Sequence, residues 1–486
     1  MKSLKKNFVY NLTYQILILI IPLITMPYIS RRLGADGIGI YSYSYSIVYY
    51  FMMFAMIGFN NYGNRTIAKS RDDKEQLTKN FKEIYCLQII TSTIMIALYY
   101  LFVIVNNSDY KHIFLLQSLY IWSCMFDINW LFFGLEEFKL TVIRNTIIKI
   151  LSLICIFLFV KTKNDTWIYT LILSGSVLLS QIVLWPFVNK RVDIKLKFKM
   201  NIKKHFLPCL KLFLPVIAVT IYKMMDKTMI GVFSPVEEVG FYENAEKIIN
   251  VPIAIITAFG TVMLPKMSNL YSKKHEKEKT LNVIEKSITA VMFISFAMTM
   301  GICSISRNFS VLFFGENFAK TGILIQYLAV TILFLAWGNV IRTQYLIPKE
   351  KDKDYIISAF IGAGVNFILN CIFVPKFGAI GACVGTISAE FFVMLYQTIA
   401  VRKELPIKKY LINTIPFMMK SIIMLIIIYP FNYVNMNNLL RLIIQVGLGC
   451  AIYGLLNIKY ILSIINIINI NKIFNKNTKR SIRIDN

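Results

Sequence analysis

Three ionisable residues interrupt an otherwise apolar stretch of the sequence, residues 209–232. Lys223, Asp226 and Lys227 are three and four positions apart, so an α-helix carries them on one face, where Asp226 offsets part of two positive charges. An ionised group at the bilayer centre costs roughly 2.5–3.5 kcal/mol, or on the order of 8 kcal/mol for three. The face is therefore expected to contact a watery cavity or protein, as groups on an ion or substrate pathway do. The alternative is that the lysines extend to the nearby outer membrane surface.

Two neighbouring apolar segments bring further charges into the membrane. Asp127 lies in the segment 113–134, and Arg144 and Lys149 lie in the segment 141–160. The guanidinium of Arg144 is shallow enough to reach the membrane surface, whereas Lys149 lies deeper. An ion pair between Asp127 and either cation is the structural interpretation, and a place in a polar cavity is the functional one.

Polar side chains also share single faces of two later segments. Glu243 and Lys247 are four positions apart and can pair within one helix. Thr386, Glu390 and Gln397 share a face on which Glu390 has no evident partner from its own helix. Glu390 is therefore a candidate proton or cation site, and a hydrogen bond to another helix is an equally good interpretation.

The first apolar segment, residues 8–29, combines polar residues with prolines. Asn11, Gln15 and Pro22 are spaced by four and seven positions and form one stripe. Because proline removes a backbone donor, Pro22 and Pro27 are expected to kink or loosen this helix. The stripe is interpreted as part of a cavity wall, with polar contact between helices as the alternative.

Motifs for covalent catalysis, nucleotide binding and metal binding are absent from the sequence. There is no GxSxG, HExxH or Walker A pattern, and the three histidines and eight cysteines form no CxxC or Cys/His cluster. No cofactor or metal is expected, and without an ATP motif any transport must use ion gradients or the membrane potential. Buried ionisable residues without catalytic motifs are typical of a secondary transporter.

The overall composition predicts the elements that hold these residues. Of 486 residues, 56% are hydrophobic and 16% are charged, whereas about a quarter are charged in soluble proteins. Apolar stretches of about 20 residues recur, the length that crosses ~30 Å of hydrocarbon. The sequence therefore predicts an all-α polytopic membrane protein with about fourteen transmembrane helices. The predicted spans are 8–29, 38–62, 84–105, 113–134, 141–160, 166–188, 209–232, 243–265, 284–305, 321–343, 355–374, 379–400, 412–430 and 439–460.

The distribution of basic residues predicts the orientation of these helices. With the N-terminus inside, the inner segments contain 38 of the 53 Lys and Arg, the outer loops contain 9 and the spans contain 6. This bias predicts that both termini are cytoplasmic. The formal charge of +27 is then a topology signal facing anionic lipids, which argues against nucleic acid as a partner. Arg31 and Arg32 are exceptions in an outer loop, which suggests contact with an anion unless Asp36 pairs with one of them.

An internal repeat divides the chain into two halves. The segments Asp36–Tyr41 and Glu237–Tyr242 share the order acid, any, aliphatic, Gly, bulky, Tyr at an offset of 201 residues. Because this offset spans six helices, the halves are expected to be parallel repeats about an axis along the membrane normal. The predicted organisation is a six-helix bundle over 1–188, a basic cytoplasmic linker over 189–211, a second six-helix bundle over 212–400, and two additional helices with a basic tail over 401–486.

Short motifs in a fixed order resemble those of Wzx-type polysaccharide flippases. These belong to the multidrug/oligosaccharidyl-lipid/polysaccharide exporter superfamily, which also contains multidrug extruders and the lipid II flippase. Each motif alone is modest, but their order between residue 5 and about residue 400 makes the set specific. The motifs are Pro27–Gly34, Gly37–Ser42, Asp127–Glu136, Phe213–Pro215, Asp226–Gly231, Gly240–Lys247 and Phe377–Ala382.

The resemblance implies alternating access to a cationic central cavity between the two halves. It also implies a polyprenyl-diphosphate-linked oligosaccharide as substrate, moved from the inner to the outer leaflet. The diphosphate requires cations, and the polyprenyl chain remains in lipid, so the cavity must open sideways. The candidate cations are Arg31, Arg32, Lys149, Lys223 and Lys227.

The resemblance also suggests roles for residues around that cavity. The first span, with Pro22 and Pro27, is expected to form a lateral portal beside the eighth span. Asp226 and Glu390 are candidates for coupling to H⁺ or Na⁺. Membrane lipids and a polysaccharide polymerase or chain-length protein are candidate partners. The expected polar residues of the cavity are Asn11, Gln15, Asp127 and Lys247.

Two other functions are weighed against this prediction. A drug or toxin extruder of the same superfamily would favour an acidic, apolar cavity for organic cations, whereas the charges here are mostly basic. A polysaccharide polymerase or ligase has a similar number of spans but usually carries a large outer loop, whereas the predicted outer loops are all short. A flippase is therefore the preferred prediction.

Overall fold

The structure, a computed structural model, describes the backbone of residues 2–463 except 107, 194–195, 197–199 and 274–275. The side chains of residues 2–17, 19, 214–216, 218–219, 222 and 277 are outside the described part. Within the described residues every regular element is a helix, which confirms the prediction of an all-α fold.

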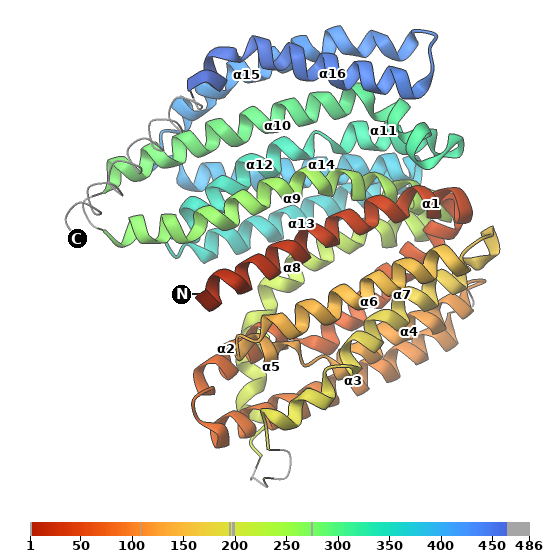
Figure 1. Cartoon of the computed structure of the whole chain (residues 1–486), viewed down its shortest axis with the longest axis vertical. Helices are drawn as coiled ribbons and strands as arrows, with labels where there is room; N and C mark the ends of the chain where they lie inside the picture. The colour runs from red at the N-terminus through yellow and green to blue at the C-terminus, as the bar shows by residue number, and fades with distance from the viewer. Residues whose placement is uncertain (1, 107, 194–195, 197–199, 274–275, 464–486) are drawn as a thin grey trace.

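The elements of the first half precede residue 191 and form one helical bundle (Figure 1). The helix α1 is long and is interrupted near its middle, and short helices separate some of the others. The elements are α1 (Lys2–Met56), α2 (Phe59–Ser70), α3 (Lys74–Val105), α4 (Lys111–Phe126), α5 (Asn129–Gly134), α6 (Phe138–Phe159), η1 (Lys163–Asp165), α7 (Thr166–Ile182) and η2 (Trp185–Lys190).

The elements of the second half begin at residue 203, and two further helices follow them. The second half consists of α8 (Lys203–Phe233), α9 (Val236–Ser272), α10 (Lys277–Phe314), η3 (Glu316–Phe318), α11 (Ala319–Leu328), α12 (Thr331–Ile341), η4 (Arg342–Leu346), α13 (Asp352–Phe377) and α14 (Ala379–Val401). The last elements are α15 (Ile407–Ile428), η5 (Tyr429–Tyr433) and α16 (Asn438–Leu456), which lie beside α10 at the edge of the molecule in Figure 1.

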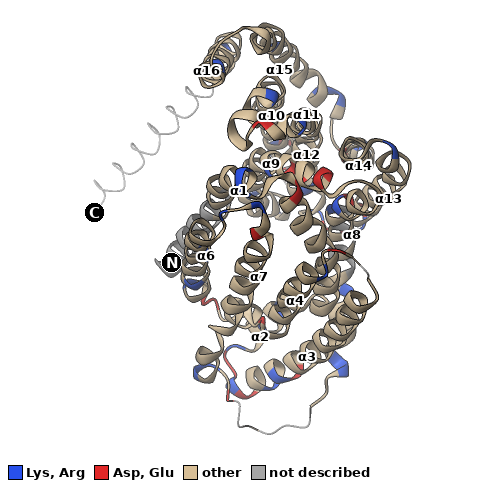
Figure 2. Cartoon of the chain, turned by 90° about the vertical axis from the view of Figure 1, so that its right-hand side faces the viewer, with Lys and Arg blue, Asp and Glu red and all other residues tan. Residues whose placement is uncertain are grey.

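Eleven described stretches are long and apolar enough to cross a bilayer. One of them, Ile20–Ser70, contains two legs because α1 turns at Gly34. Adding this second leg, α8, and α4 together with α5 gives fourteen crossing helices among the described residues, as predicted. Figure 2, which looks nearly along the helices, shows Lys, Arg, Asp and Glu as short coloured segments of a mostly tan ribbon. The protein is therefore a multi-pass membrane protein.

Local sequence explains where several helices break. Gly34 has φ 72° and ψ −177°, a conformation that is strained for residues with a Cβ atom, and α1 turns there. Gly378, with φ 57°, lies between α13 and α14 in the same way. Asp127 ends α4, and its carboxylate accepts a hydrogen bond at 3.0 Å from the backbone N–H of Asn129. This local bond divides the fourth crossing into α4 and α5.

The two copies of the repeated sequence pack against each other. A Cβ atom at Gly39 would lie 1.9 Å from the carbonyl oxygen of Val236, and one at Gly240 would lie 2.0 Å from that of Ala35. At the offset of 201 residues, Val236 is equivalent to Ala35, and Gly240 is equivalent to Gly39. This exchange of partners is what a two-fold axis between parallel repeats produces. The contact brings the backbones of α1 and α9 together near the turn of α1.

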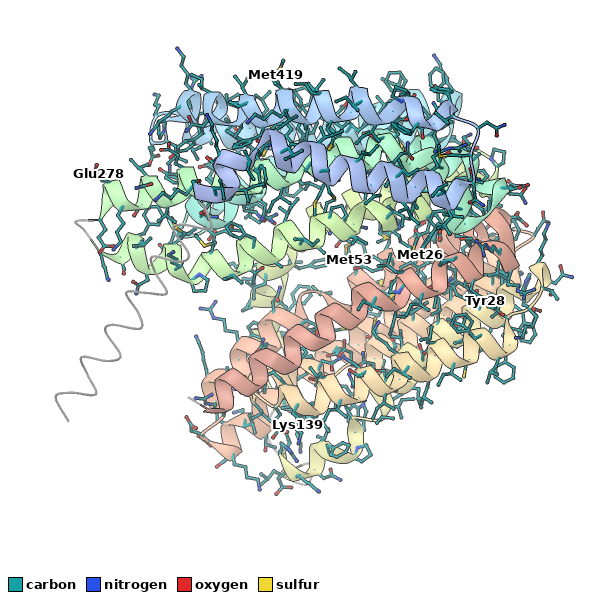
Figure 3. The ribbon with its side chains drawn as sticks, turned by 45° about the horizontal axis from the view of Figure 1, so that its top comes forward. Met26, Tyr28, Met53, Lys139, Glu278 and Met419 are labelled. Atoms are coloured by element: carbon teal, nitrogen blue, oxygen red, sulfur yellow. The ribbon has the colours of Figure 1, made fainter. Side chains whose placement is uncertain are left out.

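The helix α8 runs from one half to the other. Its first turns contact the first half, where the carboxylate of Glu83 accepts hydrogen bonds from Lys204 at 2.6 Å and from the backbone N–H of Asn201 at 2.8 Å. His205 Nε2 lies 2.9 Å from the same carboxylate, and its Nδ1 lies 2.7 Å from the hydroxyl of Tyr62. The rest of α8 packs against α13 and α9. Figure 1 and Figure 3 show the halves converging where α1 turns and diverging toward the opposite end.

Candidate functional site

A cavity of about 270 Å³ lies inside the second half, between α8, α9, α12, α13 and α14. Fewer than half of its lining residues are apolar or glycine, and the others carry hydrogen-bonding or charged groups. Neutral hydrogen-bonding groups come from Asn250, Asn339 and Gln397. The charged lining residues are Lys223, Asp226, Glu246, Arg342 and Glu390.

Asp226 is held by four neutral donors from three other helices. Its Oδ2 accepts hydrogen bonds from the hydroxyls of Tyr242 (2.7 Å) and Thr386 (2.6 Å). Its Oδ1 accepts hydrogen bonds from the amides of Asn366 (3.0 Å) and Asn370 (2.6 Å). Hydrogen bonds to a charged acceptor are about twice as strong as neutral ones, so this environment stabilises a buried carboxylate. No Lys or Arg of the described part forms a salt bridge with it.

Lys227, the next residue, faces α9 instead. Its ammonium lies 2.6 Å from Glu243 Oε2 and 2.8 Å from Glu246 Oε2. Lys247 completes the cluster, 2.9 Å from Glu243 Oε1 on the same helix. The cluster of Lys227, Glu243, Glu246 and Lys247 therefore contains two charges of each sign, and it joins α8 to α9.

The cavity is mixed in charge rather than predominantly cationic. Lys223 and Arg342 face three lining carboxylates, and adding the rest of the Lys227 cluster gives four cations and four carboxylates. The cationic cavity expected between the two halves is a different place, and it stays a prediction. Within the second half, Lys227 is neutralised by two glutamates of α9, which the spacing of charges on α8 alone does not reveal.

Arg342 is a cavity residue that was not among the predicted candidates. It begins η4, a π-helical turn, directly after α12. Its guanidinium donates to Asn339 Oδ1 at 2.7 Å and lies 5.6 Å from the centroid of the Tyr355 ring. The signal that could have found it is its position within the predicted span 321–343, where a charged side chain is costly. Turns of π-helix inside longer helices occur frequently at functional sites.

Several predicted substrate-binding residues do not line this cavity. Arg31 is exposed and donates to the backbone oxygen of Leu312 at 2.7 Å, which joins α1 to α10. Arg32 is exposed and lies 5.5 Å from the ring centroid of Tyr28. Lys149 is half-buried on α6. Of the five predicted cations, the structure places Lys223 in the cavity wall and Lys227 directly behind it.

The polar residues of the first half form a separate network. Asn129 donates to Asp127 Oδ1 at 2.7 Å and accepts from Arg144 at 3.0 Å, so it connects the two charged groups. Arg144 also donates to Asn145 Oδ1 at 2.6 Å. Gln88 of α3 donates a hydrogen bond to the backbone oxygen of Asp127 at 2.8 Å, and this bond joins α3 to the network. These contacts hold α3, α5 and α6 together and lie outside the cavity wall.

The remaining predicted residues fall into two groups. Glu390 is 7% exposed and lines the cavity, whereas Lys247 lies behind the wall in the Lys227 cluster. The helical backbone of α1 continues through Pro22 and Pro27, and the turn occurs at Gly34. The side chains of Asn11 and Gln15 lie outside the described part of the structure.

The fold defines the class of protein. A solved lipid II flippase in an inward closed conformation superposes with a TM-score of 0.77 at 17% identity, covering 94% of this chain and 100% of that one. A multidrug resistance transporter in an inward-facing conformation superposes with a TM-score of 0.57 at 15% identity, covering 79% of this chain and 98% of that one. The chain therefore has the same fold as these two membrane transporters.

The family follows from the sequence comparison. The family described as polysaccharide biosynthesis protein matches residues 4–271, more than half of the chain, and the chain belongs to it. A putative O-antigen transporter of Escherichia coli K12 is 23% identical over 411 residues, 83% of this chain and 97% of that protein. A probable low-salt glycan biosynthesis flippase of Haloferax volcanii is 25% identical over 251 residues, 49% of this chain and 50% of that protein.

Proposed function

We propose that this protein moves a lipid-linked oligosaccharide from the inner to the outer leaflet of the membrane. Its family and the names of its relatives support this substrate class. One observation supports it most directly: the two cations of the cavity wall, Lys223 and Arg342, form no salt bridge with a described residue. Neutral polar groups lie beside them, and an oligosaccharide diphosphate requires this combination of cations and neutral donors.

Arg342 is suited to bind the diphosphate. One of its terminal nitrogens donates to Asn339, and the face of the guanidinium lies near the ring of Tyr355. These contacts fix the orientation of a planar fork of donors that matches phosphate oxygens. Lys223 is exposed and adds a flexible positive charge on the wall formed by α8. The amide of Asn250 and the unpartnered Oε1 of Gln397 are the groups proposed to bind sugar hydroxyls.

Movement between leaflets requires the two halves to change their relative orientation. The backbone contact of Gly39 with Val236 and of Gly240 with Ala35 closes one end of the interface. Separating this contact would open that end, while α8, attached to both halves, would transmit the movement. This is the rocking of repeats by which many secondary transporters alternate their access.

Coupling to H⁺ or Na⁺ is proposed at Asp226. Hard cations prefer oxygen ligands, and the site holds a carboxylate, two amides and a hydroxyl. The Oδ1 atom of Asn370 is buried without a hydrogen-bond partner, so rotation of the amides would present oxygens to a cation. Protonation of Asp226 would instead turn one acceptor into a donor. Glu390, one turn along α14 from Thr386, is the second candidate.

The location proposed for this activity is a bacterial inner membrane with both termini in the cytoplasm. The connections that precede α3 and α10 and follow α14 are rich in basic residues and lie at one end of the helices, whereas most loops with few basic residues lie at the other end. This arrangement agrees with the positive-inside rule. A polysaccharide polymerase or chain-length protein remains a proposed partner at the outer surface.

The experiment that tests the function compares two cavity variants with a matched control. In a strain lacking the protein, Lys223→Ala and Arg342→Ala are expected to accumulate in the membrane yet restore less than about a tenth of the surface glycan, because each removes a charge-assisted bond to phosphate. Lys149→Ala, on α6 outside the cavity wall, is expected to restore it. Lipid-linked saccharide should build up in the inner leaflet with the first two variants. Normal surface glycan with both of them would contradict the proposal.

Export of a cationic drug is the second candidate. It is favoured by the three carboxylates of the cavity wall and by the structural similarity to a multidrug transporter. A cell expressing this protein would then accumulate less ethidium than a cell lacking it, and Glu390→Gln would remove the difference. Unchanged ethidium accumulation together with altered lipid-linked saccharide would exclude this candidate.

A further inference from the structure

A second cavity of about 270 Å³ lies at the inner end of the second half, and it shares no lining residue with the first. It is formed where α9, α10, η4 and the turn after α14 come together. Three lysines and one glutamate line it, so its net charge is positive: Lys273, Lys349, Lys403 and Glu404.

The glutamate is already occupied by neighbouring donors. Lys349 donates to Glu404 Oε2 at 2.8 Å, Lys351 donates to Oε1, and the hydroxyl of Tyr345 also donates to Oε2. Hydrogen bonds from Lys349, Lys351 and Tyr345 lower the pKa of Glu404 to about 2, so it stays ionised near neutral pH. Glu404 therefore fixes Lys349 and Lys351 and is left with little capacity to neutralise other cations.

Two tyrosine rings form the wall of this cavity and position its donors. The rings of Tyr271 and Tyr345 are 6.0 Å apart between centroids, and Lys349 Nζ lies 4.6 Å from the centroid of Tyr345. The hydroxyl of Tyr271 is buried without a hydrogen-bond partner. Lys273 and Lys403 are exposed at the rim and form no ion pair with a described residue. One phenol and two ammonium groups are thus available in one hollow.

We infer that this second cavity binds a phosphate group, presented either by an anionic phospholipid or by a small soluble phosphate. The cavity offers a fixed ammonium, two mobile ammoniums and an unpaired hydroxyl, which are the donors that phosphate oxygens accept. The cavity lies where helices end and lysine-rich connections begin. In the proposed orientation, this end of the helices faces the anionic leaflet. Basic pockets between helices on that side are a recognised place for phospholipid headgroups.

The test measures the thermal stability of the full chain in nanodiscs of phosphatidylcholine with and without phosphatidylglycerol. Phosphatidylglycerol is expected to raise the melting temperature of the wild type, and Lys273→Gln/Lys403→Gln should lose most of that gain. Loss of two lysines near the membrane surface should weaken phosphatidylglycerol binding, followed by native mass spectrometry, by about tenfold to 30-fold. The matched control is Lys69→Gln/Lys139→Gln, which removes two exposed lysines of the first half, one of them labelled in Figure 3.

The remaining outcomes identify the source of the phosphate or overturn the inference. A melting-temperature gain with millimolar inorganic phosphate or glycerol 3-phosphate in detergent, absent in Lys273→Gln/Lys403→Gln, would support a soluble phosphate. A gain with phosphatidylglycerol alone would support the lipid headgroup. An equal response of both double variants to phosphatidylglycerol would show unspecific attraction to the surface and overturn the inference. No response of the wild type to any of these phosphates would do the same.

Discussion

The two copies of the internal repeat share a backbone contact but differ in chemistry. In each copy a glycine packs on the backbone of the other copy, and a tyrosine follows two residues later, Tyr41 in one and Tyr242 in the other. The hydroxyl of Tyr41 lies 2.8 Å from that of Tyr120, whereas Tyr242 donates to Asp226 at 2.7 Å. The same position therefore joins two helices in the first half and holds a carboxylate in the second.

Asp226 and the four residues of the Lys227 cluster follow the same rule. At the offset of 201 residues each of these five has a neutral equivalent in α1, so the described part of this helix contains no matching ion cluster. The shared glycines therefore determine how the halves meet, whereas the charged groups of the cavity belong to the second half alone. The equivalent pairs are Thr25 and Asp226, Met26 and Lys227, Ser42 and Glu243, Tyr45 and Glu246, and Ser46 and Lys247.

The largest loss of stability is expected for Lys227→Met, which introduces the residue found at the equivalent position 26 of the first half. Lys227 is 7% exposed, and its loss leaves Glu243 paired with Lys247 alone and Glu246 without its cation. Removing one partner of a buried ion pair costs about 3–5 kcal/mol, so the melting temperature of the purified protein should fall markedly. Adding Glu246→Gln should recover part of the loss. A single variant as stable as the wild type would show that the cluster is dispensable.

A smaller but functional effect is expected for Asp226→Asn. The four donors around Asp226 lose their charged acceptor, at about 1.5–3 kcal/mol, and the amide cannot accept all four bonds. Surface glycan should fall at least about tenfold while the protein remains in the membrane. Thr25→Val is the matched control in the first half, since Thr25 bonds to carbonyl oxygens of its own helix at 3.1 and 3.2 Å. Equal effects of the two variants would remove the functional difference between the halves.

The shared contact is tested by Gly39→Ala and Gly240→Ala. Because each new Cβ would meet a carbonyl oxygen at 1.9 or 2.0 Å, both variants should lose about 1–3 kcal/mol of stability, and by similar amounts. Gly175→Ala and Gly364→Ala are matched controls, one in each half, with nothing within 4 Å of the added atom. Thermal unfolding of the four purified variants makes the comparison. A large loss in one copy alone would mean that the two-fold relation does not extend to packing energy.

The sequence predicted the helices more completely than the partners of their charged residues. Apolar length specifies the crossing helices, and the spacing of Glu243 and Lys247 indicates the ion pair that the structure contains at 2.9 Å. Both signals are local, because membrane thickness and helix pitch convert directly into sequence distance. The partners of Lys227 lie on another helix, and no spacing within α8 indicates them. Arg342 was missed for a related reason, since its partners Asn339 and Tyr355 are fixed by the π-helical turn and by the packing of α13, which the sequence does not show.

The smallest effect on stability is expected at the first-half equivalent of Glu243. This residue, Ser42, is 2% exposed, and its hydroxyl oxygen has no hydrogen-bond partner. Ser42→Ala removes an unsatisfied polar group, so stability should change by less than about 1 kcal/mol and can increase. Glu243→Ala, by contrast, leaves the buried Lys227 and the half-buried Lys247 with fewer partners and should destabilise by about 3 kcal/mol or more. Melting temperatures that fall equally for both variants would mean that the first half depends on this position as much as the second.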